Sequence, residues 1–399
     1  MSIPPFIPAT EIRKSSIKLG KVNIVIVTAP GFPGWETLFP SAQLLAEYSW
    51  VNPTDSALLI GTYPGALGVH LARKLPQGRL SIMDNNWTAL EITQRTLSAN
   101  NIPPEVVNIL PEIDLPQDLY QKSDMVLIQI PKGRFLTRRW LVQAYNSLAI
   151  GGSLYIAGSN NSGIQSAVKD AQGLFGPGRI LAYKKGNRVA EFVKKLADTP
   201  QPGWALAPGI ASCTWVEFTI PFSSHTFHIR SLPGIFSFDH LDEGTDMLLR
   251  TIDIPAGARV LDVGCGYGII GLYAATQGAG SVHLTDNSLL AVAACTETIA
   301  RNRITNAEVF TGHLLGSIGS YQYDLILSNP PFHAGHAVDY QIAHSMINQS
   351  FQALNPGGQM IIVANRFIRY DRLIKEIFGN ISILAESGKF HVLSGLKSS

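Results

Sequence analysis

The second half of this chain repeats the residue pattern of the first half. Glycines, acidic residues and asparagines recur about 200 residues apart, a spacing far beyond the roughly 20–50-residue period of a solenoid. The matched pairs are Pro30 and Pro233, Gly31 and Gly234, Gly61 and Gly264, Gly65 and Gly268, Gly68 and Gly271, Asp84 and Asp286, Asn100 and Asn302, and Asp124 and Asp324. A chain of 399 residues also has the length of two ordinary domains. We therefore expect two tandem copies of one domain, residues 1–200 and 208–399, joined by the proline-rich stretch 198–209.

Each copy alternates short apolar strands with helices. The expected strands are 57–60 and 259–263, 80–83 and 281–285, 124–130 and 324–328, and 153–157 and 359–364, with helices at 139–148 and 340–354 and a Gly-Gly turn before each last strand. This order predicts a largely parallel sheet covered on both faces by helices. The stretch 214–232 alternates in polarity and is expected to be β structure. The predicted fold class is α/β, with two tandem Rossmann-like domains.

Composition narrows the expected location and partners. No run reaches the roughly 18 apolar residues of a membrane span. The first 16 residues contain three prolines and lack the apolar core of a secretory signal. The three cysteines, Cys213, Cys265 and Cys295, have neither metal-binding nor disulfide spacing. We therefore expect a cytoplasmic protein with no membrane partner and no metal.

Positive charge is concentrated in the first copy. The net charge is only +2, but the stretch 122–195 holds 12 basic and 3 acidic residues. Such an excess predicts a surface that binds a polyanion, with a simple solvated basic face as the alternative.

A strand followed by a glycine turn in the second copy indicates a nucleotide-like ligand. Glycines at 264, 266 and 268 permit positive φ and a close approach of the backbone to a ligand. Asp286 ends the next strand, where a carboxylate can accept hydrogen bonds from both ribose hydroxyls. A dinucleotide enzyme would have its third glycine at the position of Ile269, so S-adenosylmethionine is favoured, and a tight turn without a ligand is the alternative. The predicted cofactor-binding residues are Asp262, Gly264, Cys265, Gly266, Gly268, Asp286, Asn287, Gly312, His313 and Asn329.

The tetrapeptide Asn329-Pro330-Pro331-Phe332 follows the apolar strand 325–328 and is predicted to be catalytic. The Asn329 side-chain carbonyl and the Pro330 backbone carbonyl can each accept one N–H of an exocyclic amine. The prolines fix φ and remove donors, and Phe332 offers a stacking face worth about 1–3 kcal/mol. Catalysis would come from positioning and electrostatics. The alternative is a rigid Pro-Pro turn that has no catalytic role. His333, His336 and His344 follow without a convincing set of metal ligands.

With these residues, the sequence resembles the bacterial ribosomal RNA guanine-(N2) methyltransferases with duplicated domains, the small-subunit type C and large-subunit type G enzymes. The resemblance is carried by Leu232–Ser237, Leu261–Gly268, Asn329–His333, Ile362–Arg366, Phe378-Gly379 and Lys389-Phe390. Phe332-His333, in place of a tetrapeptide ending in tyrosine, is the guanine-type variant. The resemblance implies two class I methyltransferase domains, S-adenosylmethionine as methyl donor, and the 2-amino group of an rRNA guanosine as acceptor. The expected partner is ribosomal RNA or a ribosomal subunit, and the protein is expected to be a monomer.

The first copy lacks the matching chemistry. Leu59 and Tyr63 stand at the positions of Asp262 and Gly266, and Gln129-Ile130-Pro131-Lys132 replaces the tetrapeptide. We therefore expect a degenerate domain that does not bind the methyl donor and instead grips RNA phosphates. The basic residues assigned to this role are Lys132, Arg134, Arg138, Arg139, Lys184, Lys185, Arg188, Lys194 and Lys195.

Three other functions remain open at this level. An adenine or protein-glutamine amine methyltransferase uses a similar tetrapeptide, usually ending in tyrosine. A non-catalytic RNA-binding assembly factor is disfavoured by the intact Asp262, Asp286 and Asn329. A dinucleotide oxidoreductase is the least favoured.

Overall fold

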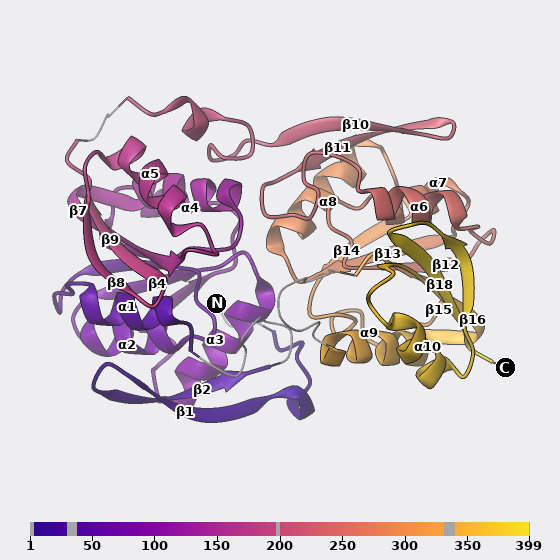
Figure 1. Cartoon of the computed structure of the whole chain (residues 1–399), viewed down its shortest axis with the longest axis horizontal. Coiled ribbons are helices and arrows are strands. Elements are labelled where there is room, and N and C mark those ends of the chain that lie inside the picture. Colours follow the sequence, from indigo (N-terminus) through magenta and orange to yellow (C-terminus); the bar gives the residue numbers. More distant parts are fainter. Residues whose placement is uncertain (1–3, 30–37, 197–199, 331–339, 399) are drawn as a thin grey trace. The chain divides into compact units, whose positions relative to one another are not determined.

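The computed structural model describes residues 4–29, 38–196, 200–330 and 340–398. The chain divides into two compact units, Met1–Trp215 and Val216–Ser399. Each unit is an α/β domain with the same order of elements, which confirms the predicted fold class (Figure 1). No helix among the described residues is both long enough and apolar enough to cross a membrane.

The sheet of the second unit has the strand order β14-β13-β12-β15-β16-β18-β17. Its strands are β12 (Arg259–Val263), β13 (Ser281–Asp286), β14 (Ala307–Thr311), β15 (Tyr323–Ser328), β16 (Leu354–Asn365), β17 (Ser382–Glu386) and β18 (Phe390–Leu396). The first five strands in this order are parallel, whereas β18 is antiparallel to both of its neighbours. Its helices are α6 (Glu243–Thr251), α7 (Ile269–Thr276), α8 (Leu289–Arg301), α9 (Tyr340–Ala353) and α10 (Tyr370–Phe378). Figure 1 shows α9 and α10 on one face of the sheet and α6, α7 and α8 on the other.

The sheet of the first unit repeats this order as β5-β4-β3-β6-β7-β9-β8. Its strands are β3 (Ser56–Ile60), β4 (Arg79–Met83), β5 (Val107–Leu110), β6 (Ser123–Gln129), β7 (Leu148–Ser159), β8 (Arg179–Lys184) and β9 (Asn187–Val193). Helices α1 (Pro40–Tyr48), α2 (Ala66–Lys74) and α3 (Trp87–Ala99) cover one face, and α4 (Arg134–Ser147) and α5 (Ile164–Phe175) cover the other. Short 3₁₀ turns lie at Ala9–Glu11, Gln117–Leu119 and Gly203–Leu206.

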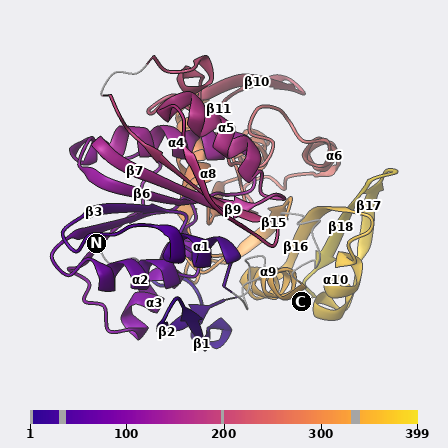
Figure 2. The same cartoon turned by 60° about the vertical axis from the view of Figure 1, so that its left-hand side comes forward.

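Each unit also begins with an antiparallel hairpin outside the main sheet. The hairpins are β1 (Arg13–Leu19) with β2 (Val22–Thr28), and β10 (Val216–Phe222) with β11 (His225–Ser231). In the first unit the Asn100 amide bonds both backbone groups of Val25, and the hairpin lies along α3 (Figure 2). In the second unit Asn302 makes the same pair of bonds to His228. The duplication therefore extends to the side chains that dock each hairpin.

The glycine pairs before the last expected strands form bulges and not turns. Gly151 lies inside β7 with φ of 86°, and Gly357 lies inside β16 with φ of 78°. The pairing of each strand with its parallel neighbour shifts register at this point. Each sheet then continues into a hairpin, β8–β9 or β17–β18, that was not predicted from the sequence.

The boundary between the units follows Trp215, whereas the sequence placed the domain ends at residues 200 and 208. The intervening stretch belongs to the first unit because Ala205 and Ile210 are buried in its core. Arg139 Nη1 also donates to the Gly209 carbonyl at 2.7 Å. A proline-rich composition marked this stretch as a linker, but its apolar residues pack on the domain before it.

Candidate active site

Asp286 joins the glycine turn to the end of the neighbouring strand. It is the last residue of β13, which lies parallel to β12, so the carboxyl ends of both strands meet at one edge of the sheet. Asp286 Oδ2 accepts from Gly266 N at 3.0 Å, and its Oδ1 accepts from Ser288 N at 2.8 Å. Burial raises the pKa of Asp286, and these backbone donors partly oppose that shift. Each carboxylate oxygen retains a lone pair for a further donor, such as a ribose hydroxyl.

Asp262 lies beneath the same turn and is fully buried. Its Oδ2 accepts from Gly271 N at 3.0 Å, whereas Oδ1 has no hydrogen-bond partner among the described residues. Burial raises the pKa of Asp262 to about 7, and the nearby Asp286 adds to this shift. A buried oxygen without a partner is costly, so the site retains an unused acceptor.

The glycines of the turn serve two different purposes. A Cβ added at Gly268, where φ is +94°, would lie 2.5 Å from Cys295 Sγ, so this glycine permits close packing of the turn on α8. A Cβ added at Gly264, where φ is +74°, would meet no atom of the described residues within 4 Å. The exposed backbone at Gly264 therefore leaves open space for a ligand. Between them, Cys265 is buried, and its hydrogen bond with Cys295 together with burial raises the pKa of its thiol.

The other predicted adenosine-side residues lie at the ends of β13 and β14. Asn287 follows Asp286 and is half-buried. Gly312 N donates to the Asp286 carbonyl at 3.0 Å, which brings the end of β14 beside Asp286. The His313 ring is buried, with 3% of the residue exposed, so any contact of this segment with a ligand at the edge would come mainly from its backbone.

Asn329 lies at the same edge, directly after β15. Strand β15 pairs with β12 on the side opposite β13, and Ser328 Oγ donates to the Val263 carbonyl at 2.7 Å. Asn329 Nδ2 donates to Asp242 Oδ2 at 3.1 Å and to Thr245 Oγ1 at 2.8 Å. Its Oδ1 is buried and has no partner among the described residues. The next residue, Pro330, is buried.

Part of the predicted tetrapeptide lies outside the described residues, namely Pro331 and Phe332, as do His333 and His336. His344 is exposed on α9. Within the described ranges, no group of three or more histidine, cysteine, aspartate or glutamate side chains has the geometry to hold a metal.

Two contact residues of Asn329 were not singled out from the sequence as parts of the site. Asp242 precedes α6 as its N-cap, and Thr245 lies in the first turn of that helix. Aspartate is a preferred N-cap residue, so a helix start at Asp242 agrees with the sequence. The partner of both residues lies more than 80 positions away along the chain, so no local spacing could reveal their contact.

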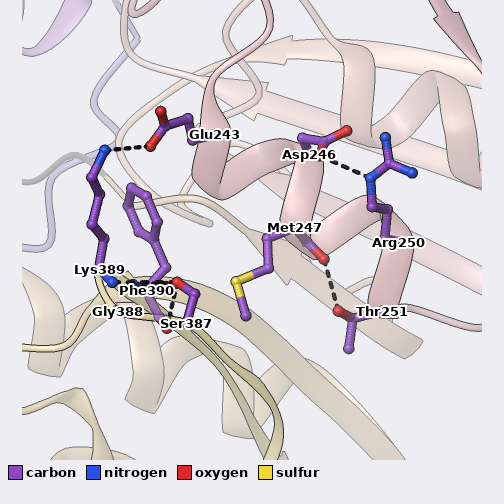
Figure 3. A pocket seen from close by; sticks show the side chains of 9 residues that line it. All are labelled: Glu243, Asp246, Met247, Arg250, Thr251, Ser387, Gly388, Lys389 and Phe390. Carbon is purple, nitrogen blue, oxygen red and sulfur yellow. Dashed lines mark hydrogen bonds and ion pairs between the residues drawn. The ribbon is translucent and has the colours of Figure 1, made fainter.

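A shallow pocket of about 580 Å³ lies elsewhere, between α6 and the β17–β18 turn (Figure 3). It is lined by Glu243, Asp246, Met247, Arg250, Thr251, Ser387, Gly388, Lys389 and Phe390. Two ion pairs lie along it, Lys389 with Glu243 and Arg250 with Asp246, both at 2.8 Å. None of the predicted cofactor-binding or catalytic residues that the structure describes lines this pocket.

The matching edge of the first unit is filled by protein side chains. Tyr63, only 6% exposed, packs in an apolar cluster with Ile7, Val27 and Ala29. Gln129 stands where Asn329 stands, and its Nε2 donates to the Gly61 carbonyl at 2.8 Å. These contacts support the expectation that the first unit does not bind the methyl donor.

Two of the basic residues assigned to RNA contact are buried, so that assignment was wrong for them. Arg139 is 1% exposed and bonds Asp114 and two backbone carbonyls. Lys194 is 2% exposed, and its Nζ donates to the Tyr145 and Leu148 carbonyls at 2.7 and 2.8 Å. Their charges stabilise the domain internally and are not available to a polyanion.

Four of the remaining basic residues are exposed lysines, and three are arginines with partners. Arg134 and Arg138 both pair with Asp170, and Arg188 stacks over the Tyr183 ring. The exposed lysines are Lys132, Lys184, Lys185 and Lys195, of which Lys184 has its Nζ 3.8 Å from Glu47 Oε2. The positive surface is therefore smaller than the charge count of the sequence indicates.

The geometry of the second unit suits S-adenosylmethionine. Among the described residues, the edge combines open space over Gly264, remaining acceptor capacity on Asp286, and Asp262 Oδ1 without a partner. On the other side of β12, Asn329 Oδ1, which has no partner among the described residues, is an acceptor for an N–H group. A ligand with ribose hydroxyls and a positive charge can therefore lie beside an amine held by Asn329.

Comparison with known proteins gives concordant matches. Residues 23–191 and 226–394 each match the family model described as methyltransferase small domain. A Pasteurella multocida protein named ribosomal RNA small subunit methyltransferase C is 35% identical over 286 residues, covering 71% of this chain and 82% of the relative. A Pseudomonas entomophila protein of the same name is 35% identical, covering 67% and 78%.

A solved structure also matches over almost the whole chain. It is the T. thermophilus 16S rRNA N2 G1207 methyltransferase in complex with AdoMet and guanosine. Its TM-score is 0.79 with 26% sequence identity, covering 96% of this chain and 98% of that one.

Proposed function

Because this chain belongs to the ribosomal RNA small subunit methyltransferase C family, built from two methyltransferase small domains, we propose that it methylates a guanosine of small-subunit ribosomal RNA. The methyl donor is S-adenosylmethionine, and the acceptor is the exocyclic 2-amino group of the base. The observation that carries the proposal is the Asn329 carbonyl, buried without a described partner at the edge that also holds the glycine turn.

The chemistry requires the amine to be held with its lone pair exposed. That lone pair is delocalised into the base, so the amine is a weak nucleophile. We assign one amine N–H to Asn329 Oδ1 and the other to the Pro330 carbonyl, which directs the lone pair toward the methyl group. S-adenosylmethionine supplies a methyl group activated by its positive sulfur. As the N–C bond forms, the C–S bond breaks with its electron pair going to sulfur, and the nitrogen loses one proton to water.

Asp286 and the glycine turn hold the donor. The carboxylate of Asp286 accepts hydrogen bonds from the ribose hydroxyls, while its hydrogen bonds from Gly266 N and Ser288 N fix its orientation. The open space over Gly264 receives the donor against bare backbone. One donor therefore binds per chain, in the second unit.

We assign the first unit to holding the RNA. Its exposed lysines, Lys132, Lys184, Lys185 and Lys195, can contact phosphates, which supply affinity without sequence choice. The protein acts as a monomer in the cytoplasm, with ribosomal RNA or an assembled subunit as its partner.

A methyl-transfer assay tests this function. The full-length chain is incubated with methyl-labelled S-adenosylmethionine and small-subunit rRNA, free or in the subunit, and the RNA is digested to nucleosides. The expected product is N2-methylguanosine, lost in Asn329→Ala. Label found only in methyladenosine or in ribosomal protein would support the rival amine acceptors. If the wild type bound no S-adenosylmethionine, the result would support the alternative of a non-catalytic RNA-binding assembly factor.

A further inference from the structure

The two ends of the Asn329 amide have nearly the same shape but opposite hydrogen-bonding roles. The carbonyl oxygen accepts, whereas the amide nitrogen donates two hydrogens. Only the carbonyl can receive an N–H of the substrate amine. A flipped amide would oppose donor to donor, so the protein must specify which end faces the substrate.

The contacts of Asn329 specify that orientation. Both Nδ2 hydrogens have acceptors, Asp242 Oδ2 at 3.1 Å and Thr245 Oγ1 at 2.8 Å. An ionised carboxylate only accepts, so the amide nitrogen and not the carbonyl must face Asp242. Oδ1 then lies on the other side, buried and without a described partner. Reversing the amide would lose both bonds and set two oxygens against each other.

The helix α6 holds this acceptor pair in place. Asp242 is its N-cap, and the same Oδ2 that accepts from Asn329 also accepts from Thr245 N at 2.9 Å. Gly244 lies between them, where an added Cβ would come 3.0 Å from Asp242 Oδ2 and 3.2 Å from Phe390 Cε1. The carboxylate is therefore fixed by the helix start before any substrate binds.

The first unit provides an internal comparison. Helix α1 begins at Pro40 as α6 begins at Glu243, so Phe39 and Ala42 occupy the positions of Asp242 and Thr245. Neither side chain can accept a hydrogen bond. There the amide at Gln129 uses both ends internally, with Nε2 on the Gly61 carbonyl and Oε1 accepting from Ser41 Oγ at 3.3 Å. The acceptor pair and the available carbonyl are thus absent together in the copy that lacks the active-site residues.

We propose that Asp242 and Thr245 are positioning residues that fix the Asn329 amide with its carbonyl toward the substrate amine. The proposal rests on the proposed function, since it assigns the residues that prepare Asn329 for that reaction. It predicts that loss of either acceptor lowers kcat, while the Kd for S-adenosylmethionine and the KM for RNA change little.

Substitutions at Thr245 separate this role from packing. Thr245→Val keeps the shape and the backbone N–H that caps the helix but removes the Oγ1 acceptor, whereas Thr245→Ser keeps the acceptor. We expect kcat to fall about 10-fold in Thr245→Val, since one hydrogen bond that orients the reacting pair is lost, and to stay within about twofold in Thr245→Ser. The Tm of each variant and its affinity for the donor accompany the rates.

Substitutions at Asp242 give a second test that does not depend on Thr245. Asp242→Ser retains a capping oxygen for the helix but is too short to reach Asn329, and we expect a fall in kcat of about 10- to 100-fold. The matched control is Asp246→Ser, which removes a half-buried carboxylate of the same helix that bonds only Arg250 among the described residues. This control should keep wild-type kcat.

The outcomes distinguish this inference from the proposed function. Wild-type kcat in both Thr245→Val and Asp242→Ser would overturn the positioning role, while an inactive Asn329→Ala would leave the function standing. A rise in donor Kd that accounts for the whole loss of rate would also overturn it, by making these residues part of the donor site. Failure of the wild type to methylate guanosine would instead refute the function itself.

Discussion

Replacing Asp262 by asparagine should change how the stability of the second unit depends on pH. In the folded unit, burial raises the pKa of Asp262 from 3.8 to about 7. Between these values the unfolded chain has lost the proton and the folded one has kept it, so stability falls as pH rises. At about 1.4 kcal/mol per pH unit, the full window costs about 4 kcal/mol, and the step from pH 5 to pH 7 about 3 kcal/mol. Asp262→Asn keeps an oxygen for Gly271 N but cannot ionise.

The assay can isolate the second unit because all six tryptophans lie within residues 1–215. Urea unfolding is followed at each pH by tryptophan fluorescence, which reports the first unit, and by far-ultraviolet circular dichroism, which reports both. The difference between wild type and Asp262→Asn cancels the titrating groups that Asp262 does not influence, and it retains Asp262 with its neighbour Asp286. We expect it to change by about 3 kcal/mol between pH 5 and pH 7 in the dichroism transition, with the tryptophan transition unaffected.

Parallel pH dependences in the wild type and in Asp262→Asn, within about 1 kcal/mol, would refute the reasoning. They would mean that Asp262 ionises in the folded unit as easily as in water. Asp262 Oδ1 would then accept a hydrogen bond within the protein and would not be available to a ligand.

Three further outcomes follow from the same structure. Gly268→Ala should destabilise the second unit by about 2–4 kcal/mol in urea unfolding, because the added Cβ would lie 2.5 Å from the Cys295 sulfur on α8. Gly264→Ala, whose added Cβ meets no atom of the described residues within 4 Å, should cost about 1 kcal/mol of stability and mainly weaken donor binding. Calorimetric titration should give one S-adenosylmethionine per chain, and Asp286→Ala should abolish it; a residual site would show that the first unit binds donor. Lys184→Glu with Lys185→Glu should weaken RNA binding and lower the slope of log K against log salt by about 2, and an unchanged slope would contradict the RNA role of that surface.

The sequence predicted the architecture well because the evidence was repeated. Two copies of the same alternation of strands and helices, each with glycines at matched positions, left few alternatives to tandem α/β domains. The hairpins β8–β9 and β17–β18 escaped prediction. Their outer strands β8 and β17 are short and mostly exposed, with Ile180 and Ile383 among the exposed residues, whereas the central strands that the pattern predicted are buried.

Charge proved a weaker guide than pattern. Arg139 and Lys194 contributed to a basic stretch in the sequence, but each is buried and satisfied by backbone carbonyls of its own domain. The sequence shows which residues are charged but not which groups bond them in the fold. The partners of these two residues lie between about 25 and 70 positions away along the chain. The repeat did contain a hint, since Lys397 binds the Leu354 carbonyl in the second unit as Lys194 binds Leu148 in the first.

In the candidate site too, the residues marked by local sequence patterns were predictable, and the contacts that depend on the fold were not. Asp262, Asp286 and Asn329 could be predicted because each lies at or next to the carboxyl end of a strand, and these ends of parallel strands meet at one edge. Asp242 and Thr245 were not readable as site residues, since their place depends on how α6 packs over that edge. The structure therefore added Asp242 and Thr245, the acceptors of the Asn329 amide, to the residues that the sequence had already singled out.

Mapping methylated guanosines in ribosomal RNA from cells that lack this protein tests the central claim most directly. Small-subunit RNA is compared by nucleoside mass spectrometry and site mapping between the deletion strain and strains complemented with wild type or Asn329→Ala. We predict that one N2-methylguanosine disappears on deletion, returns with the wild type and stays absent with Asn329→Ala. An unchanged set of N2-methylguanosines in the deletion strain would contradict the account.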